Sequence, residues 1–262
     1  FASSQRDSLV IASKYSFSMS ARDPNSGGNH RKNLVQSLEA SLRRLGTEYL
    51  DILWIHGWDQ NSDVAELMRG LDDQVRLGKV LHLGVSNAPA WLIASANTYA
   101  RERGLTPFTA MQLYYNLVER SIEREFFQLA AAQEMAIAPW SPLAGGLLTG
   151  KYDAQRGGGV SDGRLTRSPM GARTLRERSL DVSLALSKLA RELNRSPAQL
   201  ALAWLMRRSP VTTIPIIGAR TLSQLEENLG AVEVELGAPE LAALTALAPL
   251  EPESGGVKRE DE

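Results

Sequence analysis

Short apolar segments alternate with amphipathic segments along most of the chain, and this alternation restricts the folds available to it. Six segments are rich in β-branched or aromatic residues and are too short for helices, so they predict buried strands. They are Leu9–Ser13, Asp51–His56, Val80–Ser86, Thr109–Gln112, Ala136–Trp140 and Thr212–Ile216. Strands separated by helices predict a parallel sheet whose strands are joined by right-handed crossovers.

The segments between the predicted strands carry apolar residues at helical spacing, as Leu34, Leu38 and Leu42 do in the first of them. This spacing gives a helix one apolar face. The predicted helices are Arg31–Leu45, Val64–Leu77, Pro89–Arg103, Ile122–Gln133, Ser183–Leu193, Pro197–Arg207, Ser223–Leu229 and Pro239–Leu247.

Two architectures alternate strands and helices in this way, the doubly wound sheet and the (β/α)8 TIM barrel. A doubly wound nucleotide domain has a glycine-rich turn after its first strand, whereas here Lys14-Tyr15-Ser16 follows. Polar residues instead end successive strands, where barrel enzymes place their active sites. We therefore expect an α/β barrel in a single domain over residues 1–250, with a disordered tail over 251–262.

About six βα units are countable, and nothing after Ile216 resembles another strand–helix pair. A complete barrel has eight units. We therefore expect the first two strands to precede Phe1, which would make the chain an N-terminally truncated barrel.

Composition excludes several kinds of function. The 262 residues carry a net charge of −1, so no basic field favours nucleic acid. The absence of cysteine excludes disulfides, zinc–thiolate sites and cysteine nucleophiles. No apolar run approaches the roughly 18 residues of a membrane span, and three widely separated histidines do not suggest a metal site. We expect a cytoplasmic protein with no membrane or nucleic-acid partner.

The segment Asp153–Arg178 is rich in Gly, Arg and Ser and follows the fifth predicted strand. A segment of this length and composition is either a mobile loop that covers a ligand or a disordered surface insertion. Both interpretations stay open.

Lys14 directly follows the predicted strand Leu9–Ser13, and His56 ends the predicted strand Asp51–His56. A partly desolvated lysine has a lowered pKa and acts electrostatically, and a histidine in such a place donates a hydrogen bond to a carbonyl oxygen. The alternatives are a surface lysine and a structural histidine in a packed layer.

Ser86, Asn87 and Gln112 end the next two predicted strands, and all three offer donors and acceptors for an amide. Ser86 or Asn87 is also a candidate N-cap for the helix that follows. A glutamine on a short buried strand needs partners, whereas the neighbouring pair Tyr114-Tyr115 is equally consistent with loop packing.

Two later groups could bind a nucleotide. The indole of Trp140 can stack on a planar ring, and the turn Ser141-Pro142-Leu143-Ala144-Gly145 with Lys151 can approach a pyrophosphate. A plain turn is the alternative. After the last predicted strand, a helix N-terminus favours an anion, and its candidate residues are Gly218, Arg220, Thr221, Gln224, Glu227 and Asn228. Arg220 alone is equally consistent with a solvated surface charge.

These segments, in this order, resemble the aldo-keto reductase family from about Ser8 to Leu247. The resemblance rests on seven motifs: Ile11-Ala-Ser-Lys14, Ser37 to Leu45 with Tyr49-Leu-Asp51, His56-Gly-Trp-Asp59, Gly78-Lys-Val80 with Gly84-Val-Ser-Asn87, Gln112 to Asn116, Trp140-Ser-Pro-Leu143 to Tyr152, and Ile217-Gly-Ala-Arg220 with Glu226-Glu-Asn228. The Trp-Ser-Pro-Leu and Gly-Ala-Arg forms look closer to the bacterial and potassium-channel-β-like branch than to the aldose reductase branch.

The resemblance implies a barrel that binds NADP(H) without a Rossmann fold. By the family pattern, Ser86, Asn87 and Gln112 would hold the nicotinamide carboxamide, and Trp140 would stack on the nicotinamide ring. Ser141, Leu143 and Lys151 would line the pyrophosphate. Gly218, Arg220 and Gln224 would surround the 2′-phosphate, with Glu227 and Asn228 at the adenine. Arg220 favours NADP over NAD because a guanidinium pairs well with a phosphate.

The family's catalytic set is Asp, Tyr, Lys and His. Lys14 and His56 match the last two, and Tyr15 and Tyr49 are at the wrong positions to match the tyrosine. The resemblance implies an NADPH-dependent reductase that converts aldehydes or ketones to alcohols. The alternatives are a catalytically impaired NADP(H)-binding or regulatory protein, and a barrel enzyme whose Arg220 grips a sugar phosphate. The sequence does not give the substrate.

Overall fold

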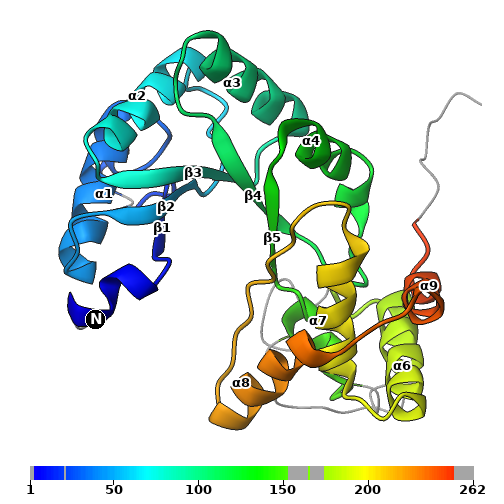
Figure 1. Ribbon diagram of the computed structural model, residues 1–262. Coiled ribbons are helices and arrows are strands. Elements are labelled where there is room, and N and C mark those ends of the chain that lie inside the picture. Colours follow the sequence, from blue (N-terminus) through cyan, green and yellow to red (C-terminus); the bar gives the residue numbers. More distant parts are fainter. Residues whose placement is uncertain (1–2, 21, 153–164, 166–173, 251–262) are drawn as a thin grey trace, which may run out of the picture. The chain divides into compact units, whose positions relative to one another are not determined.

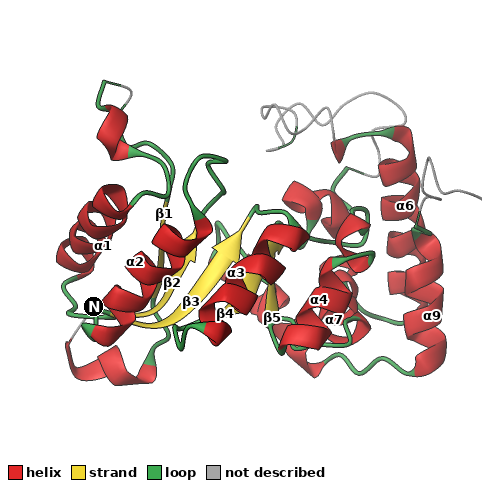
Figure 2. Ribbon diagram, turned by 90° about the horizontal axis from the view of Figure 1, so that it is seen from above, coloured by secondary structure: helices red, strands yellow, loops and turns green. Residues whose placement is uncertain are grey.

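The computed structural model describes residues 3–20, 22–152, 165 and 174–250. Its five strands form one sheet in the order in which they occur along the chain (Figure 1). They are β1 (Ala12–Tyr15), β2 (Leu50–Ile55), β3 (Val80–Ser86), β4 (Phe108–Tyr114) and β5 (Ala136–Trp140). The strands β1 to β4 pair in parallel and run side by side when seen from above (Figure 2). The predicted parallel α/β fold is confirmed.

The strand order is that of a barrel. In a doubly wound sheet the order reverses at a switch point, where nucleotides bind. Here each strand has its neighbours in the chain as its neighbours in the sheet, so the described strands contain no such point.

The chain divides into two compact units. The first comprises Phe1–Leu113, Ile122–Pro139 and Pro210–Ile214, and the second comprises Tyr114–Ser121, Trp140–Ser209 and Pro215–Glu262. The single domain expected over residues 1–250 stays a prediction. The predicted tail lies outside the described residues, as does most of the predicted loop Asp153–Arg178.

The first unit holds four α-helices that follow the strands in turn. They are α1 (Arg31–Leu45), α2 (Val64–Arg76), α3 (Ala90–Glu102) and α4 (Phe126–Gln133), with short 3-10 turns at Ser3–Ser8, Pro24–Ser26 and Ser121–Glu123, the last of which begins at the final residue of a segment of the second unit. The helix α1 has the predicted bounds, because the His30 imidazole accepts a hydrogen bond from the Asn33 amide and Gly46 adopts a left-handed φ of 64°. Its residues Leu34 and Leu38 are buried.

The predicted start of the first strand is wrong. Residues Ser3–Ser8 form a 3-10 turn, and β1 begins only at Ala12. Val10 is 76% exposed, so its apolar side chain does not mark a buried strand.

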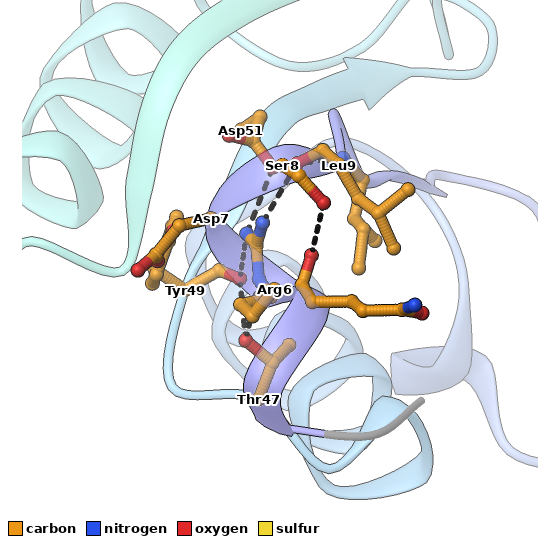
Figure 3. A network of polar contacts seen from close by, with 9 residues as sticks. Arg6, Asp7, Ser8, Leu9, Thr47, Tyr49 and Asp51 are labelled. Atoms are coloured by element: carbon orange, nitrogen blue, oxygen red, sulfur yellow. Dashed lines mark hydrogen bonds and ion pairs between the residues drawn. The ribbon is translucent and has the colours of Figure 1, made fainter.

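Arg6 fixes this N-terminal turn to the start of β2 (Figure 3). Its guanidinium donates to the Thr47 hydroxyl at 2.9 Å and to the carbonyls of Leu9 and Tyr49 at 3.0 Å each. It also pairs with the Asp51 carboxylate at 2.8 Å, and Asp51 in turn accepts from the Ile11 amide at 2.7 Å. The carbonyl of Leu9 is therefore held by a side chain, whereas a strand would pair it with a neighbouring strand.

The sixth predicted strand, Thr212–Ile216, is not a continuous strand. Only isolated parallel bridges connect it to β5, from Thr213 to Ile137 and from Ile216 to Trp140. Pro215 lies between the two bridges and has no amide hydrogen to donate, which prevents a regular ladder.

The second unit is mainly helical. It contains a 3-10 segment at Ala144–Thr149, the helices α6 (Glu177–Glu192), α7 (Pro197–Arg208), α8 (Leu222–Leu229) and α9 (Ala238–Leu247), and a 3-10 turn at Gly230–Glu233. The helix α6 begins six residues earlier than predicted, within the segment expected to be a loop, with Glu177 in its first turn. A carboxylate there interacts favourably with the helix dipole.

Trp204 on α7 is the largest fully buried side chain of the second unit. Its indole nitrogen donates to the Thr245 hydroxyl on α9 at 3.0 Å, and the Tyr115 ring lies 5.7 Å away. Arg120 donates to the carbonyls of Thr245 and Ala248 at 2.9 and 2.6 Å. These contacts fix the end of α9. No helix in the described ranges is long and apolar enough to cross a bilayer.

Candidate functional site

Two of the predicted site residues meet across the concave face of the sheet in the first unit. The Lys14 ammonium, on β1, donates a hydrogen bond to the side-chain oxygen of Gln112, on β4. Two strands lie between them, so the contact requires a curved sheet. Burial lowers the pKa of Lys14, as the sequence predicted for a lysine at this position.

Ser86 lies beside this pair, because β3 and β4 place it opposite Gln112 in the parallel register. Its hydroxyl is buried and has no hydrogen-bond partner within the described part of the chain. A buried polar group without a partner is uncommon in a folded protein. The hydroxyl is therefore available to a ligand that offers a donor or an acceptor.

Asn87 follows Ser86 with a positive φ of 49°. Its side-chain amide donates to the backbone carbonyl of His56 at 2.9 Å. The expectation that Ser86 or Asn87 caps the next helix is wrong, since α3 has Pro89 as its N-cap and no side-chain cap bond. Asn87 instead connects the ends of β2 and β3.

His56 follows β2 directly, and its amide donates to the Tyr15 carbonyl at 2.8 Å. Burial lowers the pKa of the imidazole, and the positive charge of Lys14 lowers it further. The neutral form is therefore favoured near neutral pH, and a neutral imidazole has one N–H to donate and one nitrogen that accepts. The Phe17 ring lies 4.1 Å from the imidazole, centroid to centroid.

Neither Tyr15 nor Tyr49 joins this group. Tyr15 is buried, and burial raises the pKa of its phenol, which makes it a weaker acid. The Tyr49 ring stacks under the Arg6 guanidinium at 3.8 Å, at the opposite end of β2 from His56. Leaving both out of the catalytic set stays a prediction.

Trp140 begins the candidate site of the second unit. Its ring stacks on the Tyr114 ring with centroids 4.4 Å apart and an interplanar angle of 24°. Its indole nitrogen is buried and meets no acceptor among the residues described. The stack occupies one face of the indole. Of the aromatic pair Tyr114-Tyr115, the first thus packs on Trp140 and the second on Trp204.

The turn after Trp140 has the strained backbone of a tight bend. Ser141 has a φ of 55°, and its hydroxyl accepts from the Gly145 amide at 3.1 Å while Asn116 donates to its carbonyl at 3.1 Å. Gly146 has a φ of 96°, and a Cβ there would lie 2.6 Å from the Lys151 ammonium nitrogen. The turn therefore brings a lysine ammonium against a bare backbone, beside Pro142 and Leu143.

The start of α8 forms a compact cap. The Thr221 hydroxyl accepts from the Gln224 amide at 3.3 Å, and the Gln224 side chain accepts from the Arg220 amide at 2.9 Å. Asn228 donates to the Gly218 carbonyl at 3.4 Å. The cap uses the Arg220 backbone and leaves its exposed guanidinium available.

Glu227 is exposed on α8, whereas Asn228 beside it is buried. The predicted residues of this helix thus lie within one short segment. Their bonding to a nucleotide stays a prediction.

The family comparison decides between the architectures considered above. The model of the aldo/keto reductase family matches residues 2–249. The chain belongs to the aldo/keto reductase family. This membership accounts for the strand order and for the polar groups at the carboxyl ends of the strands.

The aldo/keto reductases most similar to this chain include fungal enzymes. It is 36% identical over 251 residues to norsolorinic acid reductase stcV of Emericella nidulans, with 94% of this chain and 62% of that protein covered. It is 36% identical over 261 residues to an aryl-alcohol dehydrogenase [NADP(+)] of Phanerodontia chrysosporium, with 93% and 66% covered. The chain thus spans about three fifths of the length of the norsolorinic acid reductases it matches.

Sequence reasoning gave no role to three residues that the structure places beside His56 or its loop. They are Phe17, Asn29 and Asp59. Asp59 was noted only as part of the family motif His56-Gly-Trp-Asp59, and no sequence pattern pointed to Asn29. Spacing could not have found them, because the contacts join two loops about 30 residues apart.

Proposed function

We propose that the protein reduces aldehydes or ketones to alcohols with NADPH. The observation that carries this proposal is the cluster at the carboxyl ends of β1, β3 and β4. There, a desolvated Lys14 holds Gln112, and Ser86 offers a buried hydroxyl with no partner within the described residues. The relative named for aryl alcohols supports an aromatic carbonyl as the substrate class.

Groups in each of the two units suit parts of a nicotinamide cofactor. The unpartnered Ser86 hydroxyl suits a carboxamide, which both donates and accepts. The ring of Trp140 suits an aromatic heterocycle. The bare backbone at Gly146 with Lys151 suits a pyrophosphate, and the free guanidinium of Arg220 suits a 2′-phosphate. When bound, the nicotinamide supplies the hydride.

His56 and Lys14 supply the electrostatic part of the reaction. A neutral imidazole donates an N–H to the carbonyl oxygen of the substrate and orients it. The Lys14 charge stabilises the negative charge that develops on that oxygen. The tyrosine of the family's catalytic set, which would supply the proton, has no match in residues 1–262, and losing a general acid commonly slows a reaction by about 10²–10⁴-fold. We therefore expect the 262-residue chain to bind NADPH and to turn over slowly.

The test is to add NADPH and 4-nitrobenzaldehyde to this chain and to any longer form that its gene encodes. Loss of the nicotinamide absorbance in step with formation of the alcohol supports the proposal. A Lys14→Met variant should be slower, because it removes the charge beside the carbonyl oxygen. NADPH consumption in none of the forms would overturn the proposal.

A second candidate is an NADP(H)-binding or regulatory protein without catalysis. NADPH that raises the unfolding temperature of every form, with no turnover in any, would select it. The bacterial and potassium-channel-β-like branch and the cytoplasmic location stay predictions.

A further inference from the structure

An exposed aromatic ring lies directly over the candidate catalytic histidine. Phe17 is 59% exposed, yet its ring centroid is 4.1 Å from that of His56, with the two planes tilted by 34°. A Cβ on Gly57 would lie 3.2 Å from the Phe17 ring, so a glycine there lets the ring approach. An exposed ring keeps such a position only when its backbone is fixed.

A reciprocal pair of hydrogen bonds fixes that backbone to the loop after β2. The Asn29 amide donates to the Asp59 carboxylate at 2.6 Å, and the Asp59 amide donates to the Asn29 side-chain oxygen at 2.7 Å. The carboxylate also accepts from the Ser62 hydroxyl at 2.7 Å, and from the amides of Asn61 and Ser62. These bonds lower the pKa of Asp59 although burial opposes the shift. The pair thus holds the β1–α1 and β2–α2 loops together.

Ser16 extends this pair to both aromatic residues. The Asn29 side-chain nitrogen donates to the Ser16 hydroxyl at 2.8 Å and to the Gly57 carbonyl at 3.1 Å. The same hydroxyl accepts from the His56 amide at 3.3 Å. Ser16 has a φ of 124°, a conformation that disfavours residues with a side chain and that persists only when its surroundings impose it. It lies immediately before Phe17 in the chain.

We propose that Asn29 and Asp59 are positioning residues that hold Phe17 over His56, and that the Phe17 ring is an apolar wall selecting flat aromatic carbonyl substrates. The proposal rests on the proposed function for its substrate class. The exposed part of the ring offers a surface for a second ring, and offset aromatic pairs contribute about 0.5–1.5 kcal/mol. That range corresponds to roughly a twofold to tenfold preference for an aromatic ligand over an aliphatic one.

The positioning is tested by proton NMR without cofactor, since the chain has only three histidines. Ring current from Phe17 should move the His56 imidazole signals upfield. Phe17→Leu should return them downfield, and Phe17→Tyr should retain the shift. Asp59→Asn should also lose it, because one amide oxygen cannot accept both from Asn29 and from the turn amides. Asn61→Ala, in the same turn, spares the Asn29–Asp59 bonds and should change nothing.

Equal His56 signals in the wild type and in Phe17→Leu would overturn the positioning. So would a retained shift in a folded Asp59→Asn. If Asp59→Asn does not fold, the exposed Phe17 variants decide the question alone.

The selectivity is tested by titrating 4-nitrobenzyl alcohol and hexan-1-ol while following the same signals with NADP⁺ present. Phe17→Leu should weaken the binding of the aryl alcohol by roughly twofold to tenfold and leave the binding of hexan-1-ol unchanged. Phe17→Tyr should retain the wild-type affinity for the aryl alcohol. Equal weakening of both alcohols, no weakening, or no binding of the aryl alcohol by the wild type would overturn the proposed wall. The titration measures binding and needs no turnover. A failure of the proposed wall is therefore distinguished from an absence of reductase activity.

Discussion

At the scale of residues, the account depends on the charge of Lys14. This ammonium lies at the end of β1 in a partly desolvated position, and it is the second cause, after burial, of the lowered pKa of His56. The two residues therefore titrate as neighbours. A neutral histidine beside a charged lysine can orient a carbonyl and stabilise its oxygen at the same pH.

Replacing Lys14 by Met should therefore raise the pKa of His56, because the imidazolium would no longer form beside a positive charge. The lowered pKa of His56 also fixes the sign of its effect on the pH dependence of stability. Since the pKa in the folded protein lies below its ordinary value of 6.5, the unfolded chain binds the proton more readily and stability falls as the pH drops through 6.5. In Lys14→Met this fall should be smaller.

Titration of the His56 imidazole signals by NMR measures the shift. Lys79→Met is the matched control, since Lys79 precedes the opposite end of β3 and pairs with Glu39. An unchanged pKa in Lys14→Met, or an equal change in both variants, would contradict the coupling.

Residue patterns predicted the site unevenly. Lys14, His56, Ser86 and Gln112 lie at or next to the carboxyl ends of predicted strands, and parallel pairing brings such ends together, so their proximity followed from the sequence. The hydrogen bond from Asn87 to the His56 carbonyl could not be predicted in this way. It depends on a backbone φ of 49° at Asn87, for which the sequence carries no signal.

At the scale of elements, β2 and β3 pack without space for a methyl group. Gly84 pairs with Trp54 in the parallel register, and a Cβ on Gly84 would overlap the indole ring. Packing against the indole therefore requires a glycine at position 84. The same packing fixes the position of β3 two residues before Ser86.

Gly84→Ala should lower the free energy of unfolding by about 1–3 kcal/mol, the usual cost of overpacking a core. Urea unfolding measures it. The control is Gly218→Ala, where nothing lies within 4 Å of the added Cβ and the change should stay within about 0.5 kcal/mol. Equal stability of the wild type and Gly84→Ala would mean that the indole moves aside freely.

The N-terminal 3-10 turn makes a second prediction at this scale. Arg6→Ala removes four polar contacts and leaves the Asp51 carboxylate without its cation (Figure 3). We expect a loss of about 1–3 kcal/mol in the free energy of unfolding, typical of a group whose partner becomes unsatisfied.

Arg31→Ala is the comparison, because its pair with Asp73 is exposed on both sides, and exposed pairs contribute about 0–1 kcal/mol. Chemical unfolding of both variants under one set of conditions provides the test. If the two losses are equal, Arg6 does not anchor the turn.

The helix α1 had strong end signals and was predicted with its exact bounds, whereas two of the predicted strands differed from the structure. The helix α1 is bounded by His30 and Gly46, and both ends were predicted correctly. The sixth strand failed because Pro215 interrupts an otherwise apolar run. The first strand began late because Arg6, a residue with no strand signal, binds the Leu9 carbonyl.

At the scale of the whole molecule, the central claim is that this chain binds NADP(H). Family membership and the parallel strand order support it. Within the first unit the supporting groups are Lys14, Ser86 and Gln112, and within the second they are Trp140 and Arg220.

The most direct measurement is calorimetric titration of the chain with NADPH and, in parallel, with NADH. We expect saturable binding of NADPH at one site, weaker binding of NADH, and a preference that shrinks in Arg220→Ala because the guanidinium no longer pairs with the 2′-phosphate. Absence of NADPH binding up to about 1 mM, the upper end of common enzyme affinities, would contradict the account.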